Sequence, residues 1–347
     1  MKILFIGLGS IGQRHLRLIR KIRGDKDDIL AYRSRKKNEE VVLDDNMNVL
    51  KNKSLSSLYG VKEYENLDTA LSKKPDVAFI TNPTSLHIAF AIKVATSGCH
   101  LFIEKSLSDS EEGIDELIKI MREKNLIGYV GYQQRFHPGL LKIKTWIEDK
   151  RIGNVVSARF ENGEYLPNWH PYEDYRESFA AKKILGGGVL FGMNHELDYI
   201  IFLFGKPDRI FCAGGNLSVL DVEYEDTAEV ISMFDRQDGT LSVSVHFDYL
   251  QNPPQKCGYI IGDKGKVKWN YVKNEATLID LETGSILDSW LNPDYERNDM
   301  FIAQLNHFFE SIRTRKEVSM PIEEARHSIR IALAARKSME TNSIINF

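Results

Sequence analysis

The residues KILFIGLGSIG, numbers 2–12, decide the fold of the N-terminal part of the chain. An apolar run ends in the pattern Gly7-x-Gly9-x-x-Gly12, and apolar residues at helical spacing follow it. In a strand–turn–helix unit, Gly7 makes the tight turn and Gly9 lets the backbone approach a pyrophosphate, whereas Gly12 lets helix and strand pack closely. The start of the helix favours negative charge. The pattern predicts a dinucleotide-binding turn, and the alternative is a glycine turn without a ligand.

Strand-like and helical segments alternate through residue 125. Regular alternation of this kind predicts a parallel sheet with right-handed crossovers, and hence a doubly wound domain. Ser108 or Ser110 is the expected N-cap of the last helix. The expected strands are residues 2–7, 28–32, 60–64, 75–81, 100–105 and 126–134, and the expected helices are residues 10–22, 66–74, 85–98 and 108–125.

Beyond residue 150, strand-like runs follow one another with few helices between them. Consecutive strands predict an open, mostly antiparallel sheet, so the C-terminal part is expected to be α+β. We expect a Rossmann dinucleotide-binding domain at 1–125 and a substrate-binding and oligomerisation domain at 126–347. The expected strands are 155–162, 207–216, 227–234, 239–249, 256–263, 265–272 and 275–281, with helices near 188–205, 301–314 and 321–340.

The composition excludes several classes of protein. A chain of 347 residues suggests two domains, and its formal net charge of -3 gives no reason to expect binding to nucleic acid or anionic membranes. The 3 cysteines show no CxxC spacing, which argues against a disulfide framework or a cysteine-built zinc site and favours a cytoplasmic protein. No run approaches the roughly 18 apolar residues that span a bilayer.

The turn after the second expected strand bears on cofactor choice. An acidic residue there would bind the ribose hydroxyls of NAD, but this chain has Arg33, Ser34 and Arg35. A serine hydroxyl can donate a hydrogen bond, and an arginine can pair with a phosphate. The turn favours NADP(H), and the alternative is a solvated basic turn with NAD(H) held elsewhere.

Glu104 and Lys105 stand at the carboxyl end of an otherwise apolar strand. Ligands of open parallel sheets bind outside the carboxyl ends of the strands, where Thr81, Asn82 and Pro83 are also expected. The two charged residues are therefore expected to line a cofactor crevice. The alternative is an ion pair at the strand edge.

Five motifs together resemble the Gfo/Idh/MocA oxidoreductases, the glucose–fructose oxidoreductase and inositol dehydrogenase family. The resemblance covers nearly the whole chain. It implies a Rossmann domain, a second domain with an open sheet, hydride transfer on sugars or polyols, and a homodimer or homotetramer. The motifs are GLGSIGQRH (7–15), TNPTSLH (81–87), HLFIEKSLS (100–108), GYQQRFHP (131–138) and GGGVLFGMNHELDYIIFLFG (186–205).

The resemblance also implies roles for single residues. Lys105 matches a lysine that is catalytic or orients substrate, with Ser106 in place of the family's Pro, and Glu104 is expected to hold it. An ammonium beside a carbonyl oxygen stabilises developing alkoxide charge. The residues implied or expected to contact the cofactor are Gly7, Gly9, Ser10, Ile11, Gly12, Arg33, Ser34, Arg35, Thr81, Asn82, Pro83, His87, Glu104, Lys105 and Gln133.

His195 matches the family histidine that often acts as acid or base, a task suited to imidazole near neutral pH. The family places an Asp four residues earlier, where this chain has Phe191, so that pairing is not carried over. Asp198, one helical turn later, is a candidate partner for His195. The proton could instead be moved by Lys105 or a tyrosine. His195-Glu196 is not followed by a second His at Tyr199, so HExxH zinc chemistry is excluded.

The segment EYLPNWHPYEDYRE, residues 164–177, concentrates aromatic side chains. Flat aromatic faces suit sugar rings, and an arginine suits a carboxylate or phosphate. The alternative is an aromatic interface or lid packed on the sheet. The segment resembles a family branch associated with surface-polysaccharide and nucleotide-sugar metabolism. The expected substrate-binding residues are Arg135, Tyr165, Trp169, Tyr175, Arg176 and Asn194.

The sequence thus predicts an NADP(H)- or NAD(H)-dependent oxidoreductase acting on a sugar, polyol or nucleotide sugar, with Lys105 polarising the oxygen and His195 exchanging the proton. One alternative is an enzyme that retains its cofactor and gives net hydrolysis, elimination or epimerisation. Another is a dinucleotide-binding sensor without catalysis.

Overall fold

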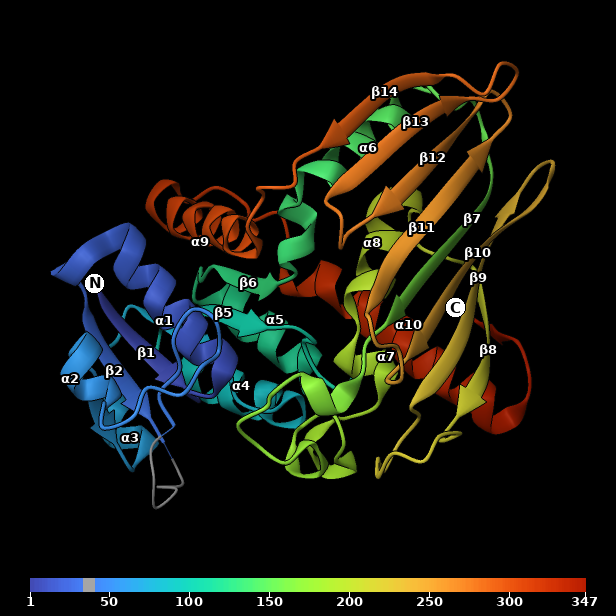
Figure 1. Ribbon diagram of the computed structural model, residues 1–347. Coiled ribbons are helices and arrows are strands. Elements are labelled where there is room, and N and C mark those ends of the chain that lie inside the picture. The colour runs from blue at the N-terminus through green and yellow to red at the C-terminus, as the bar shows by residue number, and fades with distance from the viewer. Residues whose placement is uncertain (34–40) are drawn as a thin grey trace. The chain divides into compact units, whose positions relative to one another are not determined.

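The computed structural model describes residues 1–33 and 41–347, and the described chain divides into two units (Figure 1). Unit 1 consists of Met1–Gly131 and Phe301–Arg326, and unit 2 consists of Tyr132–Met300 and His327–Phe347. Ser34 and Arg35, which bear on the cofactor choice, lie outside the described residues. The expected domain boundary after residue 125 stays a proposal. In the structure, unit 1 also takes in sixth-strand residues beyond 125 and most of the penultimate helix.

Unit 1 is built on a parallel sheet with the strand order β3-β2-β1-β4-β5-β6. The order reverses direction at β1, next to β4, as doubly wound sheets do. The strands are β1 (Lys2–Ile6), β2 (Asp28–Tyr32), β3 (Lys62–Tyr64), β4 (Val77–Ile80), β5 (His100–Glu104) and β6 (Gly128–Gly131). The helices are α1 (Ser10–Arg23), α2 (Leu55–Tyr59), α3 (Leu67–Leu71), α4 (His87–Thr96), α5 (Ile114–Glu123) and α9 (Arg297–Thr314).

An aromatic stack forms the core of unit 1. Phe79 of β4 and Phe102 of β5 are register partners in the sheet, and their ring centroids lie 4.7 Å apart. Phe308 of α9 meets Phe102 edge to face, with ring centroids 5.5 Å apart. Buried aromatic rings supply a large share of core stability. These contacts explain why most of α9, although distant in the sequence, belongs to unit 1.

The expected N-cap of α5 is wrong. The helix begins after Gly113, which has φ 74° and no capping side chain. Ser108 Oγ instead accepts a hydrogen bond from the backbone N–H of Ser110, within the preceding loop. Serine side chains often bond to nearby backbone in this way, and here that local bond replaces the cap.

Unit 2 is built on a nine-stranded sheet with the order β14-β13-β12-β11-β7-β10-β9-β8-β15. Every neighbouring pair is antiparallel except β7 and β10, which run parallel. The expected fold class is therefore confirmed. The strands are β7 (Val155–Gly163), β8 (Arg209–Gly215), β9 (Thr227–Arg236), β10 (Gly239–Asp248), β11 (Gln255–Gly262), β12 (Gly265–Asn270), β13 (Glu275–Asp280), β14 (Ile286–Leu291) and β15 (Ile345–Asn346).

Four helices accompany this sheet: α6 (Pro138–Glu148), α7 (Val189–Gly192), α8 (His195–Phe204) and α10 (Ile322–Thr341). In Figure 1, α6, α7 and α8 lie on one face of the sheet, and no helix of the described chain covers the opposite face. The sequence predicted neither α6 nor the edge strands β14 and β15. In α6 the proline occupies the first turn, where its missing N–H is not needed.

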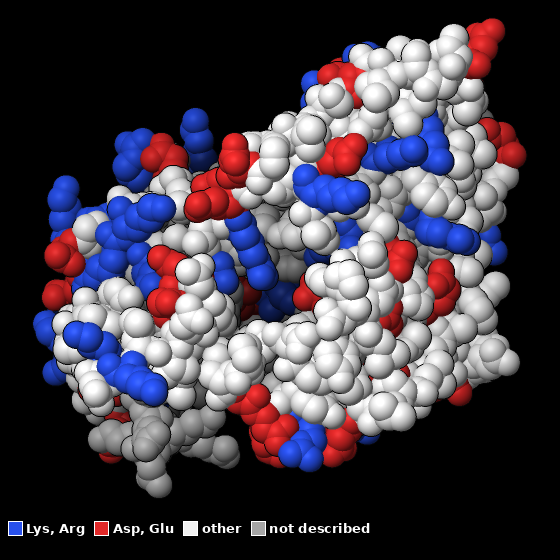
Figure 2. Space-filling view, viewed as in Figure 1, with Lys and Arg blue, Asp and Glu red and all other residues white. Residues whose placement is uncertain are grey.

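No helix among the described residues is long and apolar enough to cross a membrane. The face seen in Figure 2 carries lysine and arginine side chains interspersed with aspartate and glutamate on both units. Such interspersed charges match the small formal net charge of -3. They give no electrostatic reason to expect binding to nucleic acid on that face.

Candidate cofactor and active site

The glycine turn of unit 1 has the geometry that a pyrophosphate needs. Gly7 has φ +94°, and a Cβ there would lie 2.8 Å from the backbone N of Asn82. A Cβ on Gly12 would lie 2.5 Å from the carbonyl oxygen of Gly7, whereas a Cβ on Gly9 would meet nothing within 4 Å. Gly7 and Gly12 are thus required by packing. The space beside Gly9, at the start of α1, is open for a ligand.

This difference makes a paired prediction. Gly12→Ala is expected to lower the free energy of unfolding, because the new Cβ meets backbone. Gly9→Ala is expected to fold like the wild type but to bind NADPH and NADH about tenfold or more weakly, because the methyl group occupies the approach to the phosphates. Urea unfolding and fluorescence titration measure the two effects. Unchanged affinity of Gly9→Ala for NADPH and NADH would show that the cofactor phosphates do not bind at this turn.

The loop after β4 lies against the glycine turn. Thr81 Oγ1 donates a hydrogen bond of 2.6 Å to the carbonyl oxygen of Gly7 and ties the two loops together. The amide oxygen and nitrogen of Asn82 are buried and have no hydrogen-bond partner within the described residues. Buried polar groups are rarely left unpaired, so the Asn82 amide fits a group that a bound cofactor would supply.

The carboxyl end of β5 carries Glu104 and Lys105. Glu104 is 5% exposed, and its Oε1 lies 2.6 Å from Nε2 of His15, a fully buried residue of α1. Its Oε2 accepts a hydrogen bond of 3.1 Å from the backbone N–H of Lys105. Glu104 therefore fixes the backbone of Lys105, and His15 fixes Glu104. The Lys105–Ser106 peptide bond is cis.

His87 opens α4 and is 1% exposed. Its Nδ1 lies 2.8 Å from the carbonyl oxygen of Ser106, and its Nε2 lies 2.8 Å from that of Asn82. Burial lowers the pKa of His87. Because both ring nitrogens already face backbone carbonyls, the ring joins two loops of unit 1, and its expected contact with the cofactor stays a prediction.

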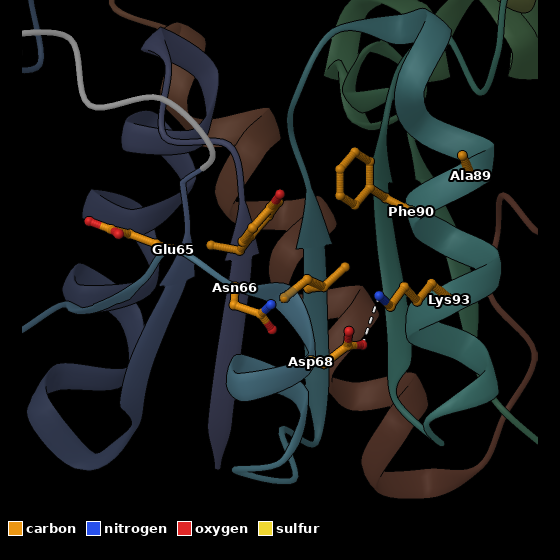
Figure 3. Close-up of a pocket in the computed structure, with 8 residues that line it drawn as sticks. Glu65, Asn66, Asp68, Ala89, Phe90 and Lys93 are labelled. Carbon is orange, nitrogen blue, oxygen red and sulfur yellow. Dashed lines mark ion pairs between the residues drawn. The ribbon is translucent and has the colours of Figure 1, made fainter.

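A pocket of about 280 Å³ lies beside the end of β2, one strand away from the glycine turn. The ring centroids of Tyr32 and Phe90 lie 5.7 Å apart at this pocket. Figure 3 shows Phe90 and Lys93 on α4 opposite Asn66 and Asp68, and a 2.7 Å ion pair joins Lys93 to Asp68. The pocket offers aromatic faces and polar edges of the kind that bind small organic groups.

In unit 2, His195 is the first residue of α8 and is 8% exposed. Nε2 of Gln133 lies 3.0 Å from Nε2 of His195, so the amide orients the ring. The rings of Tyr132 and His195 meet edge to face, with centroids 6.0 Å apart. A histidine held on both sides in this way suits a proton-transfer role, which needs a fixed ring. Lys105 belongs to unit 1, and His195 to unit 2.

Arg135 and Asp198 form a buried ion pair in unit 2. Nε and Nη2 of Arg135 donate to the two carboxylate oxygens of Asp198 at 2.9 and 2.8 Å. Ser328 Oγ donates to the same carboxylate at 3.3 Å. The expected substrate contact of Arg135 and the candidate pairing of Asp198 with His195 both stay predictions. In the structure, the planar guanidinium of Arg135 makes a bidentate ion pair with the carboxylate of Asp198.

Asn194 is fully buried and bonded within the unit. Its Oδ1 accepts a 2.5 Å hydrogen bond from the hydroxyl of Tyr132, and its Nδ2 donates to the carbonyl oxygen of Leu190 at 3.0 Å. Both ends of the amide are therefore engaged beside His195. These contacts fix the start of α8, and a substrate contact of Asn194 stays a prediction.

Phe191, at the position of the family's Asp, lies next to a second ion pair. The guanidinium of Arg336 lies 4.8 Å from the centre of the Phe191 ring and donates to both oxygens of Glu225 at 2.8 and 3.1 Å. Arg336 also donates to the carbonyl oxygen of Gly187 at 3.0 Å. A guanidinium over an aromatic face is attractive, so the phenyl ring has a packing role at this position.

The aromatic segment forms short helical turns, and several of its side chains contact other residues of unit 2. Trp169 packs edge to face on the buried Tyr249, with centroids 5.4 Å apart. The hydroxyl of Tyr175 accepts from the backbone N–H of Asp221 at 3.1 Å. Arg176 pairs with Asp174, and that pairing lowers the pKa of Asp174 to about 2. Tyr165 is half-buried. Substrate contacts of this segment stay predictions.

His15 and Tyr132 are the residues near the expected site that sequence reasoning passed over. His15 stands at helical spacing with Ile11, Leu18 and Ile22, and a polar residue at such a position is the signal that a buried partner exists. Tyr132 directly precedes Gln133, and nothing in the sequence pairs its hydroxyl with Asn194, which is 62 residues away.

Two family models match the chain. One is described as "Oxidoreductase family, NAD-binding Rossmann fold" and matches residues 1–132. The other is described as "GFO/IDH/MocA C-terminal domain" and matches residues 140–268. Together they cover most of both sheets described above.

Individual relatives share low sequence identity with this chain. Myo-inositol 2-dehydrogenase of Thermotoga maritima is 24% identical, over 98% of this chain and 96% of its own length. Levoglucosan dehydrogenase in complex with NADH and levoglucosan superposes with a TM-score of 0.83 at 17% identity, over 100% of this chain and 99% of that one. The WlbA dehydrogenase of Bordetella pertussis, in complex with NADH and UDP-GlcNAcA, superposes with a TM-score of 0.78 at 19% identity, over 100% of this chain and 98% of that one. At these identities the solved structures show the fold alone.

Proposed function

Since the chain belongs to the Gfo/Idh/MocA oxidoreductase family, we propose that it transfers a hydride between a nicotinamide dinucleotide and a sugar, polyol or nucleotide sugar. The observation that carries the proposal is the arrangement in unit 1. There an open glycine turn, the orphaned amide of Asn82 and the fixed backbone of Lys105 follow neighbouring strands β1, β4 and β5. The printed names of the relatives support a polyol or sugar substrate.

Lys105 and His195 have separate roles in this proposal. The nicotinamide, when bound, supplies or accepts the hydride. Lys105 places its ammonium beside the substrate oxygen and stabilises the alkoxide charge that develops there. His195, oriented by Gln133, gives or takes the hydroxyl proton. Residues 1–125 would bind the cofactor, and residues 126–347 the substrate.

The cofactor preference is a separate proposal. We expect NADPH to bind more tightly than NADH, because the turn after β2 is basic and lacks a carboxylate. Nη1 of Arg33 lies 3.0 Å from Oε1 of Glu63, so this guanidinium is held close to the end of β2. Levoglucosan dehydrogenase and the WlbA dehydrogenase have NADH in their complexes, which favours the opposite choice.

Titration of NADPH and NADH against protein fluorescence decides between them. The expected result is at least about tenfold tighter binding of NADPH, lost in Arg33→Ala. Equal affinities, or tighter binding of NADH in the wild type, would contradict the preference while leaving the oxidoreductase proposal intact.

Two alternatives remain distinguishable from net hydride transfer. An enzyme that retains its cofactor would convert sugars without a net change in the absorbance of reduced nicotinamide, and a sensor would convert none. The experiment is a panel of polyols, sugars and nucleotide sugars with product analysis and absorbance measured together. We expect substrate loss to equal the change in reduced cofactor.

Assembly and location stay predictions. The helix-free face of the nine-stranded sheet supports the expected homodimer or homotetramer, because an open sheet face with half-buried apolar residues such as Ile231 and Met233 suits a protein contact. A cytoplasmic location is expected from the cysteine usage alone.

A further inference from the structure

His87 stands between two loops of unit 1 that carry the proposed cofactor and catalytic residues. One contact, from Nε2, reaches the carbonyl oxygen of Asn82 at 2.8 Å, in the loop after β4. The other, from Nδ1, reaches the carbonyl oxygen of Ser106 at 2.8 Å, directly after Lys105. β4 and β5 are neighbours in the sheet, so the imidazole spans adjacent strand ends.

The side chain is almost fully enclosed, at 1% exposure, and a carbonyl oxygen can only accept a hydrogen bond. A neutral imidazole has one N–H and satisfies one of the two carbonyls, whereas the imidazolium satisfies both. Burial lowers the pKa of His87, and the two carbonyls and the charge of Glu104 oppose that shift. Both carbonyl contacts are therefore made by one buried ring, and each ring nitrogen serves one loop.

We propose that His87 is a positioning residue that clamps the Asn82 loop to the Lys105–Ser106 loop and so sets the cofactor contact and the catalytic lysine relative to each other. The part that concerns turnover rests on the proposed function. The part that concerns loop order and cofactor binding does not.

The two sides of the clamp can be removed separately. The side-chain amide nitrogen of Asn can take the place of Nδ1 of histidine, and that of Gln can take the place of Nε2. His87→Asn therefore keeps the link to Ser106 and loses the link to Asn82. His87→Gln keeps the link to Asn82 and loses the link to Ser106.

Cofactor titration and kinetics are expected to split accordingly. His87→Asn should weaken NADPH and NADH binding by about tenfold, with kcat at saturating cofactor within about twofold of the wild type. His87→Gln should leave both dissociation constants within about twofold and lower kcat by about tenfold, because the Lys105 loop is no longer held. A residue with only a general structural role would lower both quantities together in both variants.

Hydrogen exchange of the cofactor-free protein tests the clamp without any substrate. His87→Asn should speed exchange in peptides that contain residues 81–83, and His87→Gln in peptides that contain residues 105–107. His100 provides the control, because it accepts from the backbone N–H of Ile127 at the opposite end of β5. His100→Asn and His100→Gln should change neither the exchange rates in the two loops nor the dissociation constants of NADPH and NADH.

Exchange at the wild-type rate in both loops of both His87 variants would overturn the proposal. The same losses of cofactor affinity and kcat in His87→Asn and His87→Gln would overturn it as well. If the wild type converts no sugar in the presence of bound cofactor, the proposed function fails, yet exchange and titration still decide whether His87 clamps the loops.

Discussion

Replacing Lys105 by Met is expected to lower kcat/KM by about 100- to 1,000-fold while the dissociation constants of NADPH and NADH stay within about threefold. Methionine keeps the length of the side chain but removes the ammonium that would face the substrate oxygen. The backbone N–H of Lys105 and its bond to Glu104 are retained in the variant. The loss should therefore fall on the transition state rather than on the cofactor site.

Two further variants make this result interpretable. Lys105→Arg keeps a positive charge in a different shape and should recover part of the activity. Lys119→Met removes an exposed lysine of α5 that lies 3.9 Å from Glu123, and it should behave like the wild type. Normal turnover by Lys105→Met would remove Lys105 from the chemistry.

Arg135→Met is expected to lower the free energy of unfolding by about 3–5 kcal/mol. The side chains of Arg135 and Asp198 are only 9% and 2% exposed, and removing the guanidinium leaves a buried carboxylate without its bidentate cationic partner, although the hydroxyl of Ser328 still donates to it. Urea unfolding followed by circular dichroism measures the change.

The partner variant separates this explanation from a loss of packing. Arg135→Met combined with Asp198→Asn removes both charges and should recover most of the lost stability, because no buried carboxylate is left without its guanidinium. Arg151→Met, at an exposed arginine of the same unit, should stay within about 0.5 kcal/mol of the wild type. A double variant as unstable as Arg135→Met alone would show that the ion pair is not the cause.

The order of the elements could be predicted because it depends on local patterns. Apolar runs, glycine spacing and helical periodicity each act over a few residues, so β1, the glycine turn and α1 follow from residues 2–23 almost unaided. The edge strand β14 was missed since its residues are mostly exposed and lack a buried alternating face. A strand of this kind depends on its neighbour β13 more than on its own sequence.

The partners of the site residues could not be predicted in the same way. Lys105, His195 and the glycines were found by motif, but the contact between His15 and Glu104 joins residues 89 positions apart. The same holds for Arg135 and Asp198, which are 63 positions apart. Such pairs depend on how helices dock on the sheets, and residue type alone does not encode that register.

The most direct test of the account follows the hydride itself. The protein is incubated with NADPH or NADH carrying deuterium at both hydrogen positions of nicotinamide C4, together with the oxidised form of each sugar or polyol in the panel. We expect the wild type to form product with one deuterium on a sugar carbon, and Lys105→Met to form the same product far more slowly. Product that the wild type forms without deuterium, while both deuterium atoms remain on the cofactor, would contradict net hydride transfer.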